Sequence, residues 1–422
     1  MAIRYSWNVH RLRLNNSAAD LPFYPRHYQH PNSLTVATSA FICAAGATSR
    51  HSRFGRTALS ICVRFLIRAR NLMIPGITYL NWAGLAPLTL RSYLHSLIAP
   101  ELMGNILLPN WVKRVEKLRE DVALWLGTHS EQVAFVPSTS VALTIAAHSL
   151  TWQNSDTILY PANDFPANVL PWQSLDRFGV QAQAVQDWTQ PWDKPVKMVS
   201  ISTVDFTTGI EQPWQQVVQQ ANAKGIWTCV DAIQSAGVKP SWCPEIDFWC
   251  AGTQKWLASG LGLALLVLSP KVLSRLSPPF PTWLGLNQPP LVQSGMSKTA
   301  RGWELSWASP QAIARFETNL KYFQASGWEN ISQGVRQRRD YLHERLLEMG
   351  WKVVSCPERW SGLVCFDPGL GQAESIVKDG YKKRIITAQR GDYVRISPHI
   401  FNSMSSLART VDWLWKCKLE YR

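Results

Sequence analysis

The 422-residue chain lacks the usual signatures of a metalloprotein, a disulfide-bonded protein and a membrane-spanning protein. Its eight cysteines are scattered, with no Cys-x-x-Cys pair or other metal-ligand spacing. We interpret them as reduced residues in a reducing compartment, and no metal is predicted. No apolar run approaches the length needed to cross a bilayer, so no transmembrane helix is expected. The 46% hydrophobic content allows a chain of this length to bury a large core and to form two domains.

Acidic residues are almost absent from residues 1–72, which contain ten Arg, no Lys and only Asp20. This segment carries +9 of the chain's formal charge of +14, so the remainder carries only +5, which is ordinary for a soluble enzyme. Three interpretations stay open: an organelle transit peptide, a basic arm for nucleic acid or membrane, and upstream sequence outside the working protein, with Met73 as the true start. The third is favoured.

Residues 226–268 form the stretch around which the predicted fold is organised. They read as three apolar strands, the first ending in Asp231 and the second followed by Gly-Thr-Gln-Lys255-Trp. Open α/β sheets hold their ligands at the carboxyl ends of parallel strands. A pyridoxal phosphate (PLP) site needs a lysine for a Schiff base and a carboxylate that keeps the pyridine nitrogen protonated. Taken singly, such an Asp is more often a turn or helix cap, and such a Lys is more often solvated surface.

The ordered set Asp231-x-x-Gln234, strand, Gly-Thr-Gln254-Lys255-Trp resembles the class V family of PLP-dependent enzymes. That family includes certain aminotransferases, cysteine desulfurases, kynureninase and isopenicillin N epimerase-like proteins. The resemblance covers about residues 73–418. It implies that Asp231 binds the pyridine nitrogen, Gln234 bonds the ring hydroxyl and Lys255 carries the cofactor. Gln254, where the desulfurase branch has His, is taken as a further cofactor contact and is more like the epimerase-like branch.

Two earlier strand ends carry the other cofactor contacts that the resemblance implies. Thr139 and Ser140 lie between a strand at Gln132–Val136 and a helix at residues 141–150. Hydroxyls and free backbone N–H groups at a positive helix end suit a phosphate, whereas plain N-capping is the alternative. Phe165 matches the family's aromatic residue that stacks on the pyridine ring, and a core aromatic is the alternative.

Substrate contacts are expected at Asn81, which would line the mouth of the site, and at Arg395. Arg395 matches the arginine of the family's C-terminal signature, which pairs with the substrate carboxylate through its planar fork. A surface strand arginine beside Asp392 is the alternative, and His399 is expected to be structural. Desulfurases use a cysteine on the loop before this arginine, but residues 366–394 contain none. Persulfide chemistry is therefore not expected, while direct C–S elimination stays open.

The expected fold class is α/β, and the resemblance implies the PLP-dependent transferase type I fold. A large domain at residues 73–310 would hold a mixed, mostly parallel sheet, and a small C-terminal α/β domain would span residues 311–422. Residues 73–110 are assigned to the large domain, with packing against the small domain left open. Residues 1–72 are taken as a basic extension, disordered or non-native.

An aminotransferase-like enzyme acting on an amino acid is the first functional prediction. A C–S lyase or cysteine desulfurase-like enzyme, or an epimerase, is the second. A non-catalytic PLP-fold protein with a basic arm for nucleic acid or membrane is the third. Neither nucleic acid nor membrane is a favoured partner. A homodimer is expected, because the family's segment matching residues 277–301 reaches into the neighbouring subunit's site. A cytoplasmic location is expected ahead of organelle targeting by residues 1–72.

Overall fold

The computed structural model describes residues 76–97, 108–192 and 195–420. The predictions for residues 1–72 and for Met73 as the start lie outside the described residues. Its strands are β1 (Thr78–Tyr79), β2 (Val133–Val136), β3 (Thr157–Pro161), β4 (Gln181–Val185), β5 (Met198–Ser202), β6 (Trp227–Asp231), β7 (Phe248–Gly252), β8 (Ala264–Leu268), β9 (Lys352–Val353), β10 (Val364–Asp367), β11 (Ile385–Ile386), β12 (Ala388–Arg390) and β13 (Tyr393–Ile396).

Its helices are α3 (Leu90–Ser96), α4 (Leu108–Leu126), α5 (Thr139–His148), α6 (Leu170–Gln173), α7 (Trp214–Ala223), α8 (Pro270–Arg275), α9 (Pro310–Ser326), α10 (Trp328–Glu348), α11 (Gln372–Lys382) and α12 (Met404–Glu420). None of them, within the described ranges, is both long and apolar enough to cross a bilayer.

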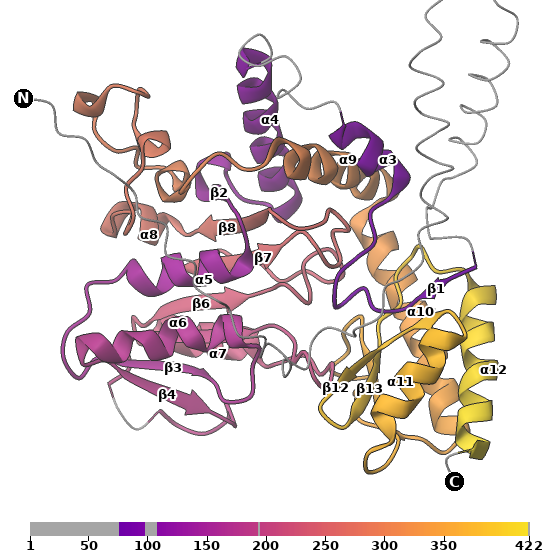
Figure 1. Cartoon of the computed structure of the whole chain (residues 1–422). Helices are drawn as coiled ribbons and strands as arrows, with labels where there is room; N and C mark the ends of the chain where they lie inside the picture. The colour runs from indigo at the N-terminus through magenta and orange to yellow at the C-terminus, as the bar shows by residue number, and fades with distance from the viewer. Residues whose placement is uncertain (1–75, 98–107, 193–194, 421–422) are drawn as a thin grey trace, which may run out of the picture. The chain divides into compact units, whose positions relative to one another are not determined.

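A seven-stranded sheet in the order β2-β8-β7-β6-β5-β3-β4 lies at the centre (Figure 1). The pairs from β4 through β3, β5 and β6 to β7 are parallel, whereas β8 is antiparallel to both of its neighbours. The predicted mixed, mostly parallel sheet is therefore confirmed. Because only β8 runs the other way, the carboxyl ends of the remaining strands meet at one edge. This edge is where open α/β sheets hold their ligands.

Apolar residues on both sides of the strands explain why the sheet is covered by helices on both faces. Val230 and Trp249 belong to the cluster that packs against α4, α7 and α9. Cys229 and Phe248, one position away on the same strands, belong to the cluster that packs against α5 and α6. The alternation follows from the pleat, which turns successive side chains to opposite faces.

A second sheet in the order β12-β13-β10-β9 is antiparallel throughout and packs with α10, α11 and α12 (Figure 1). The N-terminal strand β1 pairs in parallel with β11, and Asn81 forms a bridge with Ser397. The start of the described chain is thus tied to its C-terminal part by backbone hydrogen bonds. The division at residue 310 stays a prediction.

A buried ion pair joins α4 to the edge strand β2. Arg119 Nη1 lies 2.7 Å from Glu304 Oε1 and also donates to the carbonyl oxygen of Val133 at 2.6 Å. The same Glu304 oxygen accepts from the backbone N–H of Phe135 at 2.8 Å. Both side chains are buried, and Arg119 also pairs with the more exposed Glu116 at 3.1 Å. Removing Glu304 therefore leaves the buried N–H of Phe135 without this acceptor and takes one of two carboxylates from Arg119.

We therefore expect Glu304→Ala to lower the free energy of unfolding by about 1–3 kcal/mol, the cost of a buried donor left without its acceptor, measured by urea denaturation. Glu374→Ala is the matched control, because the Glu374–Lys378 pair is as short, at 2.6 Å, but more than half exposed. Its loss should cost less than about 1 kcal/mol. Equal losses in the two variants would contradict a structural role for the buried pair.

Candidate active site

Helix α5 begins at the edge where the strand ends converge. Ser138 is its N-cap and accepts from the backbone N–H of Val141, so α5 starts at Thr139, two residues earlier than predicted. Thr139 and Ser140 thus occupy its first turn, where backbone N–H groups are free. The Thr139 hydroxyl is buried without a hydrogen-bond partner. A buried hydroxyl at a positive helix end is suited to an anionic ligand.

Gly252 at the end of β7 brings Thr139 and Gln254 together. A Cβ atom on Gly252 would lie 2.1 Å from Gln254 Oε1 and 2.8 Å from Thr139 Oγ1. Both separations are too short for a real Cβ, so a side chain here would displace the Gln254 amide and the Thr139 hydroxyl from the end of β7. The predicted residues Thr139 and Gln254 therefore both lie against the end of β7.

Asp231 lies at the end of the central strand β6 and is 4% exposed. Its Oδ1 accepts from the backbone N–H of Ile233 at 2.9 Å. Burial, followed by the charge of Asp164, raises the pKa of Asp231 to about 7. A cation supplied by a ligand would restore the charged carboxylate, because an opposite charge favours the ionised form.

Gln234 is held by two hydrogen bonds beside the Lys255 turn. Its Nε2 donates to the carbonyl oxygen of Ala83 at 3.2 Å, and its Oε1 accepts from Trp256 Nε1 at 3.2 Å. These bonds use one of the two N–H groups of Nε2 and one lone pair of Oε1. The second N–H is therefore left for the predicted bond to a cofactor hydroxyl.

Lys255 and Phe165 face each other across the sheet edge. Lys255 Nζ lies 5.9 Å from the centroid of the Phe165 ring. Burial, followed by the charges of Arg395 and Arg390, lowers the pKa of Lys255 to about 7, although Asp231 acts in the opposite direction. A large fraction of this amine is therefore neutral near pH 7, as a nucleophile or a general base requires.

Asp164 is a site residue that sequence reasoning missed. Its Oδ2 accepts from Asn168 Nδ2 at 2.9 Å and from the Ser202 hydroxyl, and its Oδ1 accepts from the backbone N–H of Phe165. Its charge raises the pKa of both Asp231 and Lys255. The only sequence signal was its position directly before Phe165. The side chain acts on the site electrostatically and also fixes the turn that carries Phe165.

Arg395 on β13 and Asn81 after β1 lie within hydrogen-bond range of each other. Arg395 is 1% exposed, its Nη1 donates to the carbonyl oxygen of Phe206 at 2.8 Å and its Nη2 donates to Asn81 Oδ1 at 3.4 Å. Its Nε is buried without a partner. Among the described residues the guanidinium therefore has only neutral acceptors, and it retains donor capacity for a carboxylate.

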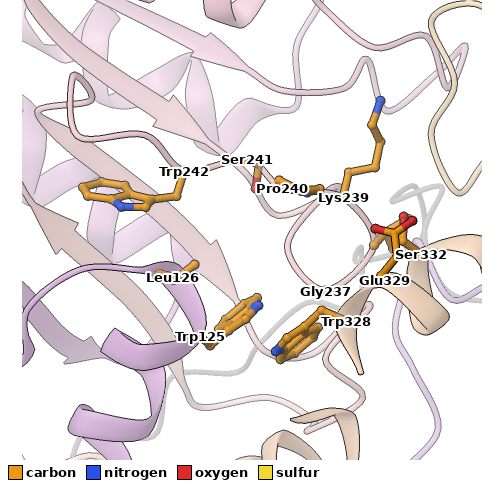
Figure 2. Close-up of a pocket in the computed structure, with 11 residues that line it drawn as sticks. Trp125, Leu126, Gly237, Lys239, Pro240, Ser241, Trp242, Trp328, Glu329 and Ser332 are labelled. Carbon is orange, nitrogen blue, oxygen red and sulfur yellow. The ribbon is translucent and has the colours of Figure 1, made fainter. Parts of the chain in front are cut away.

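Two hollows differ in their relation to these residues. One, of about 480 Å³, is lined by Ser140, Phe165 and neighbours from the start of α6, and so opens beside two predicted cofactor contacts. The other, of about 160 Å³, lies between the ends of α4 and α10 (Figure 2). There Trp125 and Trp328 stack with ring centroids 4.5 Å apart. None of the predicted site residues lines it, so it is separate from the candidate site. In the described residues, no cluster of His, Cys, Asp or Glu could hold a metal ion.

The chain is similar in sequence to one family and to several known proteins. The sequence model of the family "Aminotransferase class-V" matches residues 107–395. An uncharacterized aminotransferase, YcbU, of Bacillus subtilis (strain 168) is 26% identical over 317 residues, covering 72% of this chain and 84% of that protein. A cysteine desulfurase of Cronobacter sakazakii is 23% identical over 308 residues, covering 67% of this chain and 74% of that protein.

Solved structures share the fold. The cystine C–S lyase C-DES in complex with its reaction product cysteine persulfide has a TM-score of 0.74 at 19% identity, covering 81% of this chain and 98% of that one. A cysteine desulfurase of Thermococcus onnurineus NA1 has a TM-score of 0.72 at 17% identity, covering 82% and 95%. The type I fold expected from the sequence is therefore confirmed.

The charges around Lys255 predict how the apo-protein takes up PLP at different pH. Only the neutral amine reacts with the aldehyde, so the rate of appearance of the visible cofactor band should rise with pH through about 7. Arg395→Gln removes a positive charge that depresses the pKa of Lys255, and should move the midpoint to higher pH. Asp164→Asn removes a negative charge that raises it, and should move the midpoint to lower pH.

Arg395→Lys keeps the charge and is the control for Arg395→Gln, so its midpoint should stay near that of the unchanged protein. Stopped-flow absorbance across the pH range measures all four proteins. Midpoints that do not move, or that move in the same direction in Arg395→Gln and Asp164→Asn, would contradict this electrostatic account.

Proposed function

The chain belongs to the aminotransferase class V family, and we propose that it transfers the amino group of an α-amino acid in a PLP-dependent reaction. One observation carries the proposal. A lysine of lowered pKa, a buried carboxylate and a buried arginine with unused donor capacity lie together at the carboxyl edge of the central sheet. A Schiff-base lysine, a pyridine-nitrogen partner and a substrate carboxylate anchor are the three groups such a reaction needs.

The residues present fit PLP. Thr139 offers a buried hydroxyl without a partner at the start of α5, where a phosphate would gain N–H donors, and Ser140 follows it. Asp231 is a buried carboxylate that forms no ion pair with any described residue, and a protonated pyridine nitrogen would provide its cation. Phe165 is 51% exposed and would have its open ring face covered by the pyridine ring.

When bound, PLP supplies an electron sink for the carbanion that forms at the substrate's α-carbon. Asp231 would hold the pyridine nitrogen and, as a carboxylate, keep it protonated. Gln234 and Gln254 would contact the polar groups of the cofactor. Phe165 would cover one face of the ring and exclude water from it.

Arg395 would bind both oxygens of the substrate carboxylate through its planar guanidinium and so fix the position of the α-carbon relative to Lys255. The neutral Lys255 amine would take the proton from that α-carbon and hold it on Nζ. Its pKa of about 7 suits both directions, because a group that titrates near the working pH can accept and donate a proton.

A C–S lyase acting by direct elimination is the second candidate. The relatives include a cysteine desulfurase, and a structural neighbour is a cystine C–S lyase. Persulfide chemistry on this chain has less support. Residues 366–394 contain no cysteine, and burial raises the pKa of Cys365 to about 12, which keeps that thiol protonated.

We also propose a homodimer in the cytoplasm. Apolar side chains of residues 277–301 are exposed, among them Trp283 at 54% and Val292 at 77%. Exposed apolar clusters of this kind support a protein–protein contact. Sedimentation of the purified chain as a dimer would support the first part, and fractionation of the source cells tests the second.

Two assays on the holoenzyme separate the candidate reactions. An aminotransferase consumes an amino acid only when a 2-oxo acid acceptor is present, whereas a C–S lyase releases pyruvate from cystine without an acceptor. We expect acceptor-dependent turnover, with Lys255→Ala lowering kcat by roughly 10²–10⁴-fold. Acceptor-independent pyruvate would favour the second candidate. A kcat in Lys255→Ala equal to that of the unchanged protein would contradict both candidate reactions.

A further inference from the structure

A second arginine shares the face of the small sheet that carries Arg395. In the antiparallel β12–β13 hairpin, Arg395 pairs with Ala388, and Arg390 pairs with Tyr393. Residues directly opposite each other, and residues two apart on one strand, point to the same face. Arg390 and Arg395 are therefore diagonal neighbours on one face, with Cα atoms roughly 7–8 Å apart.

That face looks toward the candidate site. On β10, Cys365 pairs with Arg395 and belongs to the hydrophobic cluster of the central sheet. Val364 and Val394, on the opposite face, belong to the cluster of α10, α11 and α12. Both Arg390 and Arg395 act on Lys255, since their charges add to the effect of burial in lowering its pKa.

Neither arginine has an acidic partner in the part of the chain that the structure describes. Arg395 donates to Phe206 and Asn81, and Arg390 Nη1 donates to the carbonyl oxygen of its neighbour Gln389. No described carboxylate forms an ion pair with either of them.

The carboxylates near this face are engaged elsewhere or face the lysine. Asp205 Oδ1 accepts from the backbone N–H groups of Thr207 and Thr208, at 2.7 and 3.1 Å. Asp164 and Asp231 act on Lys255. Arg395 is buried and Arg390 is partly buried, and neither has a counterion among the described residues. Burying cations without a counterion costs free energy, so anions from outside the chain would stabilise this arrangement.

We propose that the substrate carries a second anion, a carboxylate or sulfinate at the end of its side chain, with Arg395 binding the α-carboxylate and Arg390 the second anion. This proposal rests on the proposed function, because it assumes that Arg395 faces an amino acid bound at Lys255. One guanidinium suffices for one carboxylate, since its planar fork engages both oxygens. The diagonal spacing leaves the second guanidinium for a separate group. Arg390 would thus determine specificity for acidic over neutral amino acids.

Matched substrates test the proposal on the holoenzyme. L-Aspartate and L-asparagine, and L-glutamate and L-glutamine, differ mainly in the charge of the side chain, and L-cysteine sulfinate tests the sulfinate arm. We expect kcat/KM to be higher for at least one acidic amino acid than for its neutral partner. For L-cysteine sulfinate the neutral partner is L-alanine. Arg390→Gln should reduce that ratio by about 10–100-fold, as expected for a lost hydrogen bond to a charged group. Arg275→Gln, an exposed arginine on α8, should leave the ratio unchanged.

A binding measurement separates failure of this proposal from failure of the proposed function. Calorimetry with succinate and butyrate, which need no turnover, should show tighter binding of succinate, and Arg390→Gln should abolish that preference. A protein that turns over no amino acid but retains Arg390-dependent succinate binding would contradict the proposed function alone. Equal affinity for the two acids, or an equal loss of kcat/KM for acidic and neutral amino acids in Arg390→Gln, would overturn the role of Arg390.

Discussion

The candidate site depends on holding the Lys255 amine and the Asp231 carboxylate together where water is largely excluded. Burial lowers the pKa of the first and raises the pKa of the second, so each favours its neutral form. The parallel strands impose this arrangement. Strands β6 and β7 end at the same edge of the sheet, so Asp231 at the end of β6 and Lys255 just after β7 lie on that edge. A bound group that carries both a positive and a negative charge would complement it. The PLP cofactor that class V enzymes use is such a group.

The surrounding packing keeps this part of the molecule in place. His399 stacks on Trp82 with ring centroids 4.5 Å apart, and its Nε2 lies 3.1 Å from the carbonyl oxygen of Trp256. Burial lowers the pKa of His399 to about 3, so the ring stays neutral at physiological pH. A Cβ on Gly362 would come within 2.3 Å of the Trp256 ring, so glycine is needed there. The residue after Lys255 is thus fixed by segments from both ends of the described chain.

The sequence allowed the fold and most of the proposed site to be predicted because these depend on local patterns. Apolar strands that end in Asp231 and before Lys255 predict a parallel sheet with both groups at its carboxyl edge, and the structure brings them there. The edge strand Gln181–Val185 was missed, because its alternating Gln and Ala residues are mostly exposed and carry little hydrophobic signal. Asp164 and Arg390 were missed for another reason. Their relation to Lys255 arises from tertiary pairing, through Ser202 and Asn168 for the first and the β12–β13 hairpin for the second.

The most direct test of the central assignment is to reduce the PLP-loaded protein with borohydride and map the modified peptide by mass spectrometry. Reduction fixes the cofactor to the nitrogen that holds it, so the label identifies the residue without any assumption about substrate. The account predicts one label per chain, on the peptide that contains Lys255. A label on another lysine, or none on a protein that has bound PLP, would contradict it.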